Sequence, residues 1–239
     1  MKLVNSILAM GFLIPVMGYS QANLEIWPVT LTSSSNKTPV LWIKNLSTKS
    51  SSLQIRVLNW KQKKNEDIYS EQNAVYPQPS FLVIGPAEQI PVRFFGIEEK
   101  GEKELSYKVV ISELPVYSGV EKHKKNSISI LMQYVIPFFV YQNNVSNLIL
   151  PGSDGIPKEK HQIDISKIDG ELYLKNMGVT HIKVDKLTLC NLKQNCQSKK
   201  MPVTYILPGS DRKLTQVNNK FESGYLKISS GNYKESFSY

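Results

Sequence analysis

One apolar stretch, residues 126–141 with the sequence NSISILMQYVIPFFVY, constrains the fold of this chain more than any other segment. Every second residue from Ile128 to Val140 is apolar, and this period of two is the signature of a β-strand with one apolar face. The opposite face is polar at first, with Ser127 and Ser129, and becomes apolar toward its end. We therefore expect the second half in a core and the first half outside it.

This stretch is also long for one strand, and it contains Pro137. At about 3.3 Å per residue it would reach about 50 Å, whereas the common strand has about five or six residues. Proline lacks the N–H that a central strand needs and belongs at a sheet edge or a bulge. We therefore expect a long edge strand, Ile128–Tyr141, whose open border pairs with the sheet of another chain. Taken alone, the stretch leaves an ordinary core strand open as the alternative.

The first residues indicate an exported protein. Lys2 gives residues 1–22 a positive start, and the apolar run that follows is too short to span a bilayer. Ser20 and Ala22 are small residues at the positions that signal peptidase reads, so 1–22 is predicted to be a signal peptide and Asn23 the mature start. No later segment is apolar for long enough to cross a membrane, so the mature protein is expected to be soluble in an oxidising compartment.

Cysteine usage and charge fit that compartment. Cys190 and Cys196 are the two cysteines, and in an exported protein such a pair predicts a disulfide, here across a hairpin. The net charge of +9 favours acidic partners, but the chain shows no basic helix and no zinc spacing, so nucleic acid is not expected among them. The three histidines lie in polar surroundings and are interpreted as surface residues: His123, His161 and His181.

From Asn23 onward, short alternating runs separated by Ser, Asn, Gly and Pro predict an all-β sandwich architecture. Polar residues follow Tyr141, and they divide the chain into a predicted N-terminal domain, 23–142, and a smaller C-terminal sandwich, 143–239. The strands expected in the first domain are Leu24–Val29, Pro39–Asn45, Ser52–Trp60, Ser80–Ile84, Gln89–Gly96, Ser106–Glu113 and Ile128–Tyr141. Those expected in the second are Gln162–Ser166, Glu171–Lys175, His181–Leu189, Pro202–Ile206, Lys213–Val217 and Gly224–Ile228.

Catalytic motifs do not assemble in this sequence. It has no GxSxG, no HExxH, no phosphate-binding glycine loop and no calcium loop of the DxDxDG type. Glu98, Glu99 and Glu102 form an acidic turn with neighbouring lysines, and catalysis by these carboxylates is the one enzymatic hypothesis that the sequence offers. We expect a non-enzymatic protein without metal or cofactor.

The order and spacing of several segments are similar to those of one known family. The segments are IWPVTLTSSS, VLWIKN, QIRVLNW, PSFLVIGPAEQIPVRFF, SYKVVISELP and NSISILMQYVIPFFVY. Together they resemble the periplasmic chaperones of the chaperone–usher pathway, and NLEIWP, RVLNW and IPFFVY look most like the archaic (alternative) branch. The resemblance implies two immunoglobulin-like β-sandwich domains in a boomerang arrangement, with pilus subunits and an outer-membrane usher as partners in the periplasm. It leaves open whether the chaperone self-associates when it holds no subunit.

The resemblance also implies a mechanism, donor-strand complementation. A pilus subunit of this pathway lacks its last strand, and the chaperone supplies a strand that fills the open groove. By match to the family's alternating donor residues, the side chains that enter the groove are those of Ile128, Ile130, Met132 and Tyr134. A secreted adhesin or a pilus subunit itself is the alternative function that the sequence leaves open.

Two departures from the family pattern concern charge. Leu24 and Pro137 occupy the positions where the best-known branch has an arginine and a lysine that hold the C-terminal carboxylate of the subunit. A buried carboxylate needs a cationic partner, and the candidates are Lys108 first, then Arg93 and Arg56.

The family also joins its two domains by a buried charge network. Glu113 matches one member of that network, whereas Tyr141 and the segment 229–233 occupy the places of the other two. We therefore expect the contact between the domains to be built differently in this chain.

Overall fold

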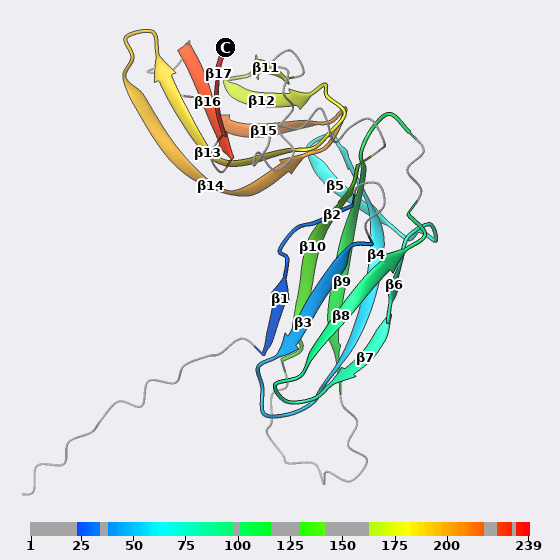
Figure 1. Cartoon of the computed structure of the whole chain (residues 1–239). Helices are drawn as coiled ribbons and strands as arrows, with labels where there is room; N and C mark the ends of the chain where they lie inside the picture. The colour runs from blue at the N-terminus through cyan, green and yellow to red at the C-terminus, as the bar shows by residue number, and fades with distance from the viewer. Residues whose placement is uncertain are drawn as a thin grey trace, which may run out of the picture.

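A computed structural model describes residues 23–33, 38–97, 101–115, 130–141, 163–217, 224–230 and 233–239 of the 239-residue chain. These residues form strands and turns only, in two β-sandwich bodies set at an angle to each other (Figure 1). The described ranges contain no helix, and hence none long and apolar enough to cross a membrane. The expected all-β fold with two sandwich domains is confirmed. The signal peptide 1–22 and the boundary at 142 lie outside the described residues and stay predictions.

Two sheets build the first body. The four-stranded sheet has the order β1 (Leu24–Trp27), β3 (Val40–Asn45), β8 (Gln89–Phe95) and β6 (Tyr76–Gln78). The six-stranded sheet has the order β2 (Leu31–Ser33), β10 (Gln133–Val140), β9 (Leu105–Leu114), β4 (Ser51–Lys63) and β5 (Glu66–Ser70), with β7 (Phe81–Ile84) also paired to β4.

The core of the first body follows from period-two alternation. In β3, Leu41 and Ile43 are fully buried, whereas their neighbours along the strand are only half-buried. The inner faces of the two sheets meet where the Phe94 and Phe138 ring centroids lie 5.3 Å apart. Because alternate residues of a strand point to opposite faces, each sheet contributes one apolar face to a shared core.

The second body pairs a three-stranded with a four-stranded sheet. The first has the order β11 (Ile163–Ile168), β12 (Glu171–Asn176) and β15 (Asp211–Gln216). The second has the order β14 (Cys196–Ile206), β13 (Ile182–Asn191), β16 (Gly224–Ser230) and β17 (Tyr233–Ser238). Leu172, Val184 and Leu226 are fully buried in the core between them.

Several strands differ from the sequence predictions. β2, β5, β6 and β17 were not expected, and β14 begins at Cys196 instead of Pro202. β4 also continues to Lys63 and turns back into β5 through Lys64 and Asn65, which have φ angles of 50° and 65°. Two consecutive positive φ angles make the tight hairpin turn whose twist matches that of the strands. The charged segment after Trp60 therefore first extends its own sheet and then crosses to β6 in the other.

The predicted disulfide is present and closes the tip of the β13–β14 hairpin. Cys190 and Cys196 are six residues apart and face each other across the two strands. Closing so short a loop removes little entropy from the unfolded chain, so we expect the change Cys190→Ser with Cys196→Ser to lower the free energy of unfolding by only about 2 kcal/mol. Urea unfolding of the double variant beside the oxidised wild type measures this loss, and a fall above about 5 kcal/mol would contradict it.

Candidate functional site

β10 leaves most of one edge open. On one side it is antiparallel to β9 along its whole length, from Gln133 opposite Ser112 to Val140 opposite Leu105. On the other side only Phe138–Val140 pair, in parallel, with β2. Among the residues that the structure describes, 133–137 has no strand beside it on that side. Within the described residues the expected edge strand begins at Gln133. Its predicted start, Ile128, lies outside the described residues.

The backbone of β10 directs its odd-numbered residues to this open edge. The N–H of Glu113 donates to the carbonyl oxygen of Met132 at 3.0 Å. In an antiparallel pair, hydrogen-bonded and non-hydrogen-bonded positions alternate, so even-numbered residues bond to β9 and Gln133 and Val135 point their backbone groups outward. Pro137 falls on the outward side, where its missing N–H breaks no bond to β9.

The side chains of this strand run from the core into solvent. Ile136 and Phe138 are buried in the first body, and Tyr134 packs against the same core at half burial. Just before the strand, Met132 and Ile130 continue the same period of two in the sequence and are 45% and 74% exposed. An apolar row beside unpaired backbone groups is a surface prepared for strand pairing.

Glu113 fixes the start of this edge. Its Oε2 accepts the backbone N–H of Met132 at 3.0 Å, and its Oε1 is buried without a hydrogen-bond partner. Burial first, and then the negative charge of Glu113, raise the pKa of Tyr134, while a backbone hydrogen bond to Leu24 acts in the opposite direction. Glu113 therefore lies beside Met132, at the end of β9 that is far from the second domain. The prediction that matched Glu113 to the charge network between the domains is wrong, because Glu113 does not lie at the junction of the domains.

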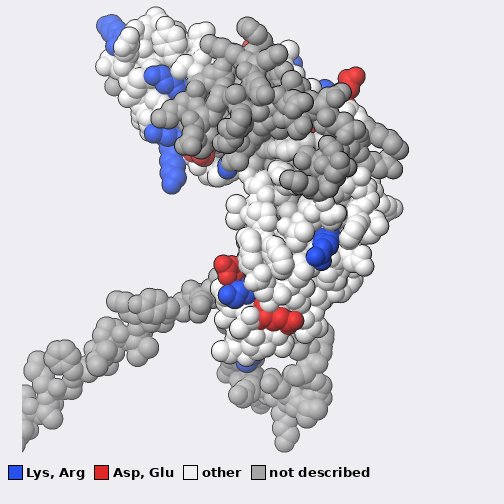
Figure 2. All heavy atoms as spheres, in the orientation of Figure 1, with Lys and Arg blue, Asp and Glu red and all other residues white. Residues whose placement is uncertain are grey.

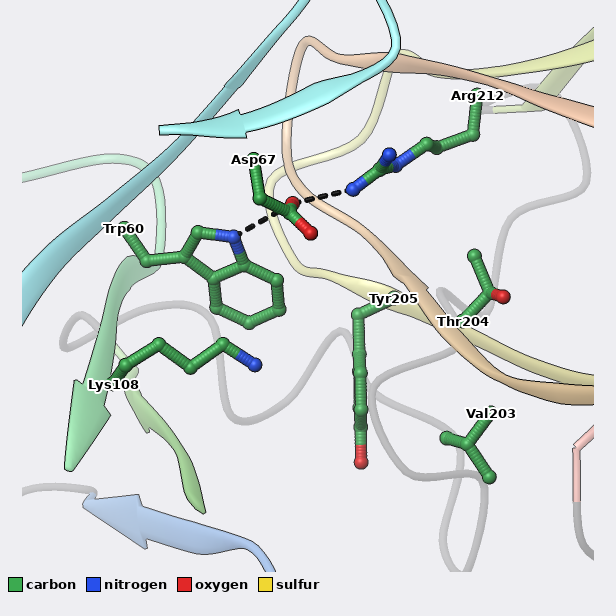
Figure 3. Close-up of a pocket in the computed structure, with 7 residues that line it drawn as sticks. All are labelled: Trp60, Asp67, Lys108, Val203, Thr204, Tyr205 and Arg212. Carbon is green, nitrogen blue, oxygen red and sulfur yellow. Dashed lines mark hydrogen bonds and ion pairs between the residues drawn. The ribbon is translucent and has the colours of Figure 1, made fainter. Parts of the chain in front are cut away.

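Between the two domains lies a cleft of about 270 Å³ with an aromatic wall and a lysine (Figure 3). Lys108 stands in β9 opposite Pro137, and its Nζ lies 3.6 Å from the centroid of the Trp60 ring and 5.8 Å from that of Tyr205. Such contact with aromatic faces stabilises a cation that has been removed from water. The lining residues are Trp60, Asp67, Lys108, Val203, Thr204, Tyr205 and Arg212.

The carboxylate that lines this cleft, Asp67, is bound to residues other than Lys108. Asp67 accepts hydrogen bonds from Trp60 Nε1 at 2.9 Å and Gln62 Nε2 at 2.9 Å, and it pairs with Arg212. Burial tends to raise the pKa of Asp67, but these three partners outweigh it and lower the pKa. Burial also lowers the pKa of Lys108 to about 8, partly opposed by the charge of Asp67. Among the described carboxylates, none forms an ion pair with Lys108.

A second buried contact joins the two domains. Glu104 precedes β9, and its Oε2 lies 2.8 Å from His181 Nδ1 and accepts the His181 backbone N–H at 3.2 Å. The His181 ring stacks on Phe139 of β10 with centroids 3.5 Å apart. The interpretation of His181 as a surface residue is wrong, because Glu104 and Phe139 bury it between the domains, where it is 1% exposed. His123 and His161 lie outside the described residues.

Gln62 adds a polar bridge across the same junction. Its Nε2 donates to the carbonyl oxygen of Tyr205 at 2.9 Å, and its Oε1 accepts the backbone N–H of Leu207 at 2.9 Å. The junction is therefore built from residues in or next to β4, β5, β9 and β10 on one side and β13, β14 and β15 on the other. The sequence analysis missed Trp60, Asp67, Tyr205 and Arg212, because their contact depends on how the two domains meet.

The other candidate cations lie elsewhere. Arg93 is exposed on β8, in the four-stranded sheet that does not reach the cleft. Arg56 is on β4, 3.6 Å from Glu71, with its side chain 43% exposed. Leu24 and Pro137 are both buried and carry no charge, as their residue types imply. Glu102 is exposed, and Glu98 and Glu99 lie outside the described residues.

Comparison with known proteins agrees with this geometry. Residues 28–145 match the family model of the pili and flagellar-assembly chaperone, PapD N-terminal domain. No curated protein matches the chain. Among solved structures, the CsuC–CsuE chaperone–tip adhesion subunit complex of the archaic Csu pili of Acinetobacter baumannii has a chain with 26% identity and a TM-score of 0.64, covering 91% of this chain and 98% of that one.

Two further solved structures share the fold at lower identity. The Salmonella enterica SafA pilin–SafB chaperone complex matches with 10% identity and a TM-score of 0.66, over 93% of this chain and 99% of that one. The chaperone DraB of E. coli matches with 14% identity and a TM-score of 0.60, over 90% and 97%.

The fold, the open strand edge and these matches define a class, and the chain belongs to the family of pilus-assembly chaperones of the chaperone–usher pathway. Within that class its likeness is to the archaic branch, as the 26% identity to the archaic Csu structure indicates.

Proposed function

We propose that this chaperone holds an incomplete pilus subunit by lending it the edge of β10. The observation that carries the proposal is the apolar series of alternate residues that is buried at Phe138 and Ile136, half-buried at Tyr134, and exposed just before the strand at Met132 and Ile130. Ile128 continues the same period of two in the sequence. Each such side chain contributes roughly 1.5–3 kcal/mol when it is buried in a groove.

Backbone hydrogen bonds give the complex its register. Gln133 and Val135 offer outward N–H and C=O groups, and a strand of the subunit that pairs with them extends the six-stranded sheet by one member. Folding of the subunit and binding are then one event, because the groove becomes stable only when a strand fills it. The edge of the chaperone is in turn protected from pairing with the wrong partner.

Lys108 is the anchor that we propose for the C-terminal carboxylate of the subunit. It is the one of the three candidate cations that lines the cleft, and the described carboxylates leave it without an ion pair. A carboxylate bound there gives the Lys108 ammonium group a charge-assisted hydrogen bond in place of the water that burial removes. Arg93 and Arg56 are less suited, since Arg93 lies on the sheet that does not reach the cleft and Arg56 lies beside Glu71.

The remaining parts of the proposal concern place and partners. The predicted leader 1–22 exports the chain to the periplasm, where the chaperone carries its subunit to an outer-membrane usher. The same edge also offers a surface for self-association of the free chaperone, because an unpaired apolar edge can pair with a second copy as well as with a subunit. The alternative of an adhesin or a pilus subunit is not favoured by the family match.

Co-expression tests the proposal. The full chain carries a C-terminal affinity tag and is expressed with the subunits encoded in the same pilus gene cluster, and the tagged chain is purified from the periplasmic fraction. We expect one subunit to co-purify in a stoichiometric complex and to be degraded or aggregated when the chaperone is omitted. The proposal would be contradicted if the chain were recovered in surface fibres, or if no subunit co-purified with it.

The Lys108 anchor predicts a pH dependence. Because the pKa of Lys108 is about 8 in the folded chain, its positive charge is present below that pH and lost above it. We expect the affinity of the wild type for the subunit to fall as the pH rises from 7 to 9. The Lys108→Met variant should bind about tenfold more weakly than the wild type at pH 7, and its affinity should not fall further at pH 9. Arg56→Met is the control, and equal pH profiles in wild type and Lys108→Met would contradict the anchor.

Linkage gives a second readout without any subunit. The pKa of Lys108 is lower in the folded chain than in the unfolded one, so the unfolded state binds more protons between these two values. The cost of burying the charged lysine is therefore fully present below the folded pKa and disappears as the pH rises toward the unfolded value. Relative to Lys108→Met, the wild type gains stability with pH in that window.

A further inference from the structure

The outer face of the four-stranded sheet in the second domain gathers lysines. Lys186 of β13 lies directly opposite Lys200 of β14, and Lys227 of β16 lies opposite the next outward residue of β13, Thr188. All three lysines are exposed. Their inward neighbours Leu187, Leu226 and Ile228 are buried in the core, which fixes the lysines on the outward side of the sheet. We call Lys186, Lys200 and Lys227 the lysine face.

Charge on this hairpin is not balanced within the described chain. Residues 182–206 contain five lysines and a single acidic residue, Asp185. None of the described carboxylates forms an ion pair with a member of the lysine face. Like charges directly opposite each other on two strands are destabilising, so the pair Lys186–Lys200 costs the free domain stability that an anionic partner would restore.

The lysine face is continuous with the cleft between the domains. Tyr205 pairs with Lys183 on the same outward side of β14 and β13, one bulge away from Lys186. The Tyr205 ring meets Trp60 and Phe139 of the first domain and lines the cleft of Lys108. Figure 2 shows blue lysine and arginine atoms along the side of the second domain that carries the β13–β14 hairpin, above the hollow between the domains. The open edge of β10 lies on this side in Figure 1.

From this arrangement we infer that the lysine face contacts an acidic surface on the subunit held by β10. This inference rests on the proposed function and adds a second contact to it. A subunit strand paired to β10 brings the body of the subunit under the hairpin, where three lysines face it. Charges of this kind at the rim of an interface mainly accelerate encounter and add little to final affinity.

A rate measurement tests the inference. The subunit recovered by co-purification is unfolded in urea and diluted into chaperone, and complex formation is followed on native gels over time. The variant Lys186→Thr with Lys200→Thr and Lys227→Thr keeps strand-forming residues at all three positions. Lys49→Thr with Lys63→Thr and Lys175→Thr is the matched control, because it removes the same charge from exposed lysines outside this face.

At about 20 mM salt, where screening is weak, we expect the lysine-face variant to capture subunit about fivefold more slowly than the wild type and the control variant. At about 500 mM salt the three proteins should react at the same rate. Equal rates at low salt would overturn the inference and leave the proposed function intact, whereas failure of the wild type at both salts would remove the proposed function itself. Vesicles containing phosphatidylglycerol form a separate arm. Loss of vesicle binding in the lysine-face variant, with unchanged capture of subunit, would assign the lysines to a membrane and also overturn the inference.

Discussion

Ile130→Arg is expected to abolish subunit capture while the chaperone itself stays folded. Ile130 is 74% exposed in the free chain, so its replacement should change the free energy of unfolding by no more than about 0.5 kcal/mol. In the complex the same position enters an apolar groove, where an unpaired guanidinium costs several kcal/mol in addition to the lost burial. Since about 1.4 kcal/mol is a factor of ten, the affinity should fall at least about 100-fold.

Two companion variants make this result specific. Val83→Arg places the same charge on β7, at a valine that is 66% exposed, and should capture subunit normally. Ile130→Val keeps an apolar, β-branched side chain and should retain most of the affinity. Co-purification from the periplasm measures all three, and circular dichroism confirms their fold. Normal amounts of complex with Ile130→Arg would show that β10 is not the donor strand.

Glu104→Ala should produce the largest loss of stability among the changes at the junction of the domains. The side chains of Glu104 and His181 are 0% and 1% exposed, and one carboxylate oxygen serves both the ring and the backbone N–H of His181. Removing one partner of such a buried pair leaves the other without compensation and typically costs about 3–5 kcal/mol. Calorimetry should show the transition of the second domain at lower temperature, separated from that of the first.

Two further variants distinguish a specific Glu104–His181 pair from packing alone. Glu104→Gln keeps hydrogen-bonding atoms in place and should lose less than Glu104→Ala. Adding His181→Leu to Glu104→Ala removes the stranded imidazole, so the double variant should recover part of the stability. Small-angle scattering on the same proteins reports whether the two domains keep their mutual angle. If the Glu104→Ala protein were as stable as the wild type, the Glu104–His181 pair would not be what holds the two domains together.

Alternation along the chain was sufficient to predict the architecture, because a strand that buries one face must show period two. Leu41 and Ile43 are examples, and so are Ile136 and Phe138. The three-residue strand β2 escaped prediction since it is too short to show a period, although it defines where the edge of β10 closes. β5 escaped because it is exposed throughout and its sequence is charged.

The candidate site was predictable in part for the same reason. The period-two pattern predicted an apolar face that includes Ile130 and Met132, because such a pattern depends on one segment alone, and both side chains are exposed. The sequence ranked Lys108 ahead of Arg93 and Arg56, but it did not predict the aromatic contacts of Lys108. Those contacts depend on the three-dimensional arrangement, because Trp60 and Tyr205 are 145 positions apart in the chain. His181 is the clearest failure, since its polar neighbours in sequence say nothing about a carboxylate 77 positions away.

Pro137 has one more consequence. A subunit strand that pairs along the open edge of β10 meets backbone N–H donors at Gln133 and Val135. The next outward residue, Pro137, has no N–H to donate. Immediately beyond it, Leu31 of β2 already pairs with Phe138. Any strand that pairs with this edge must therefore end at Pro137. This fixed end point determines the register in which each subunit lies on the chaperone.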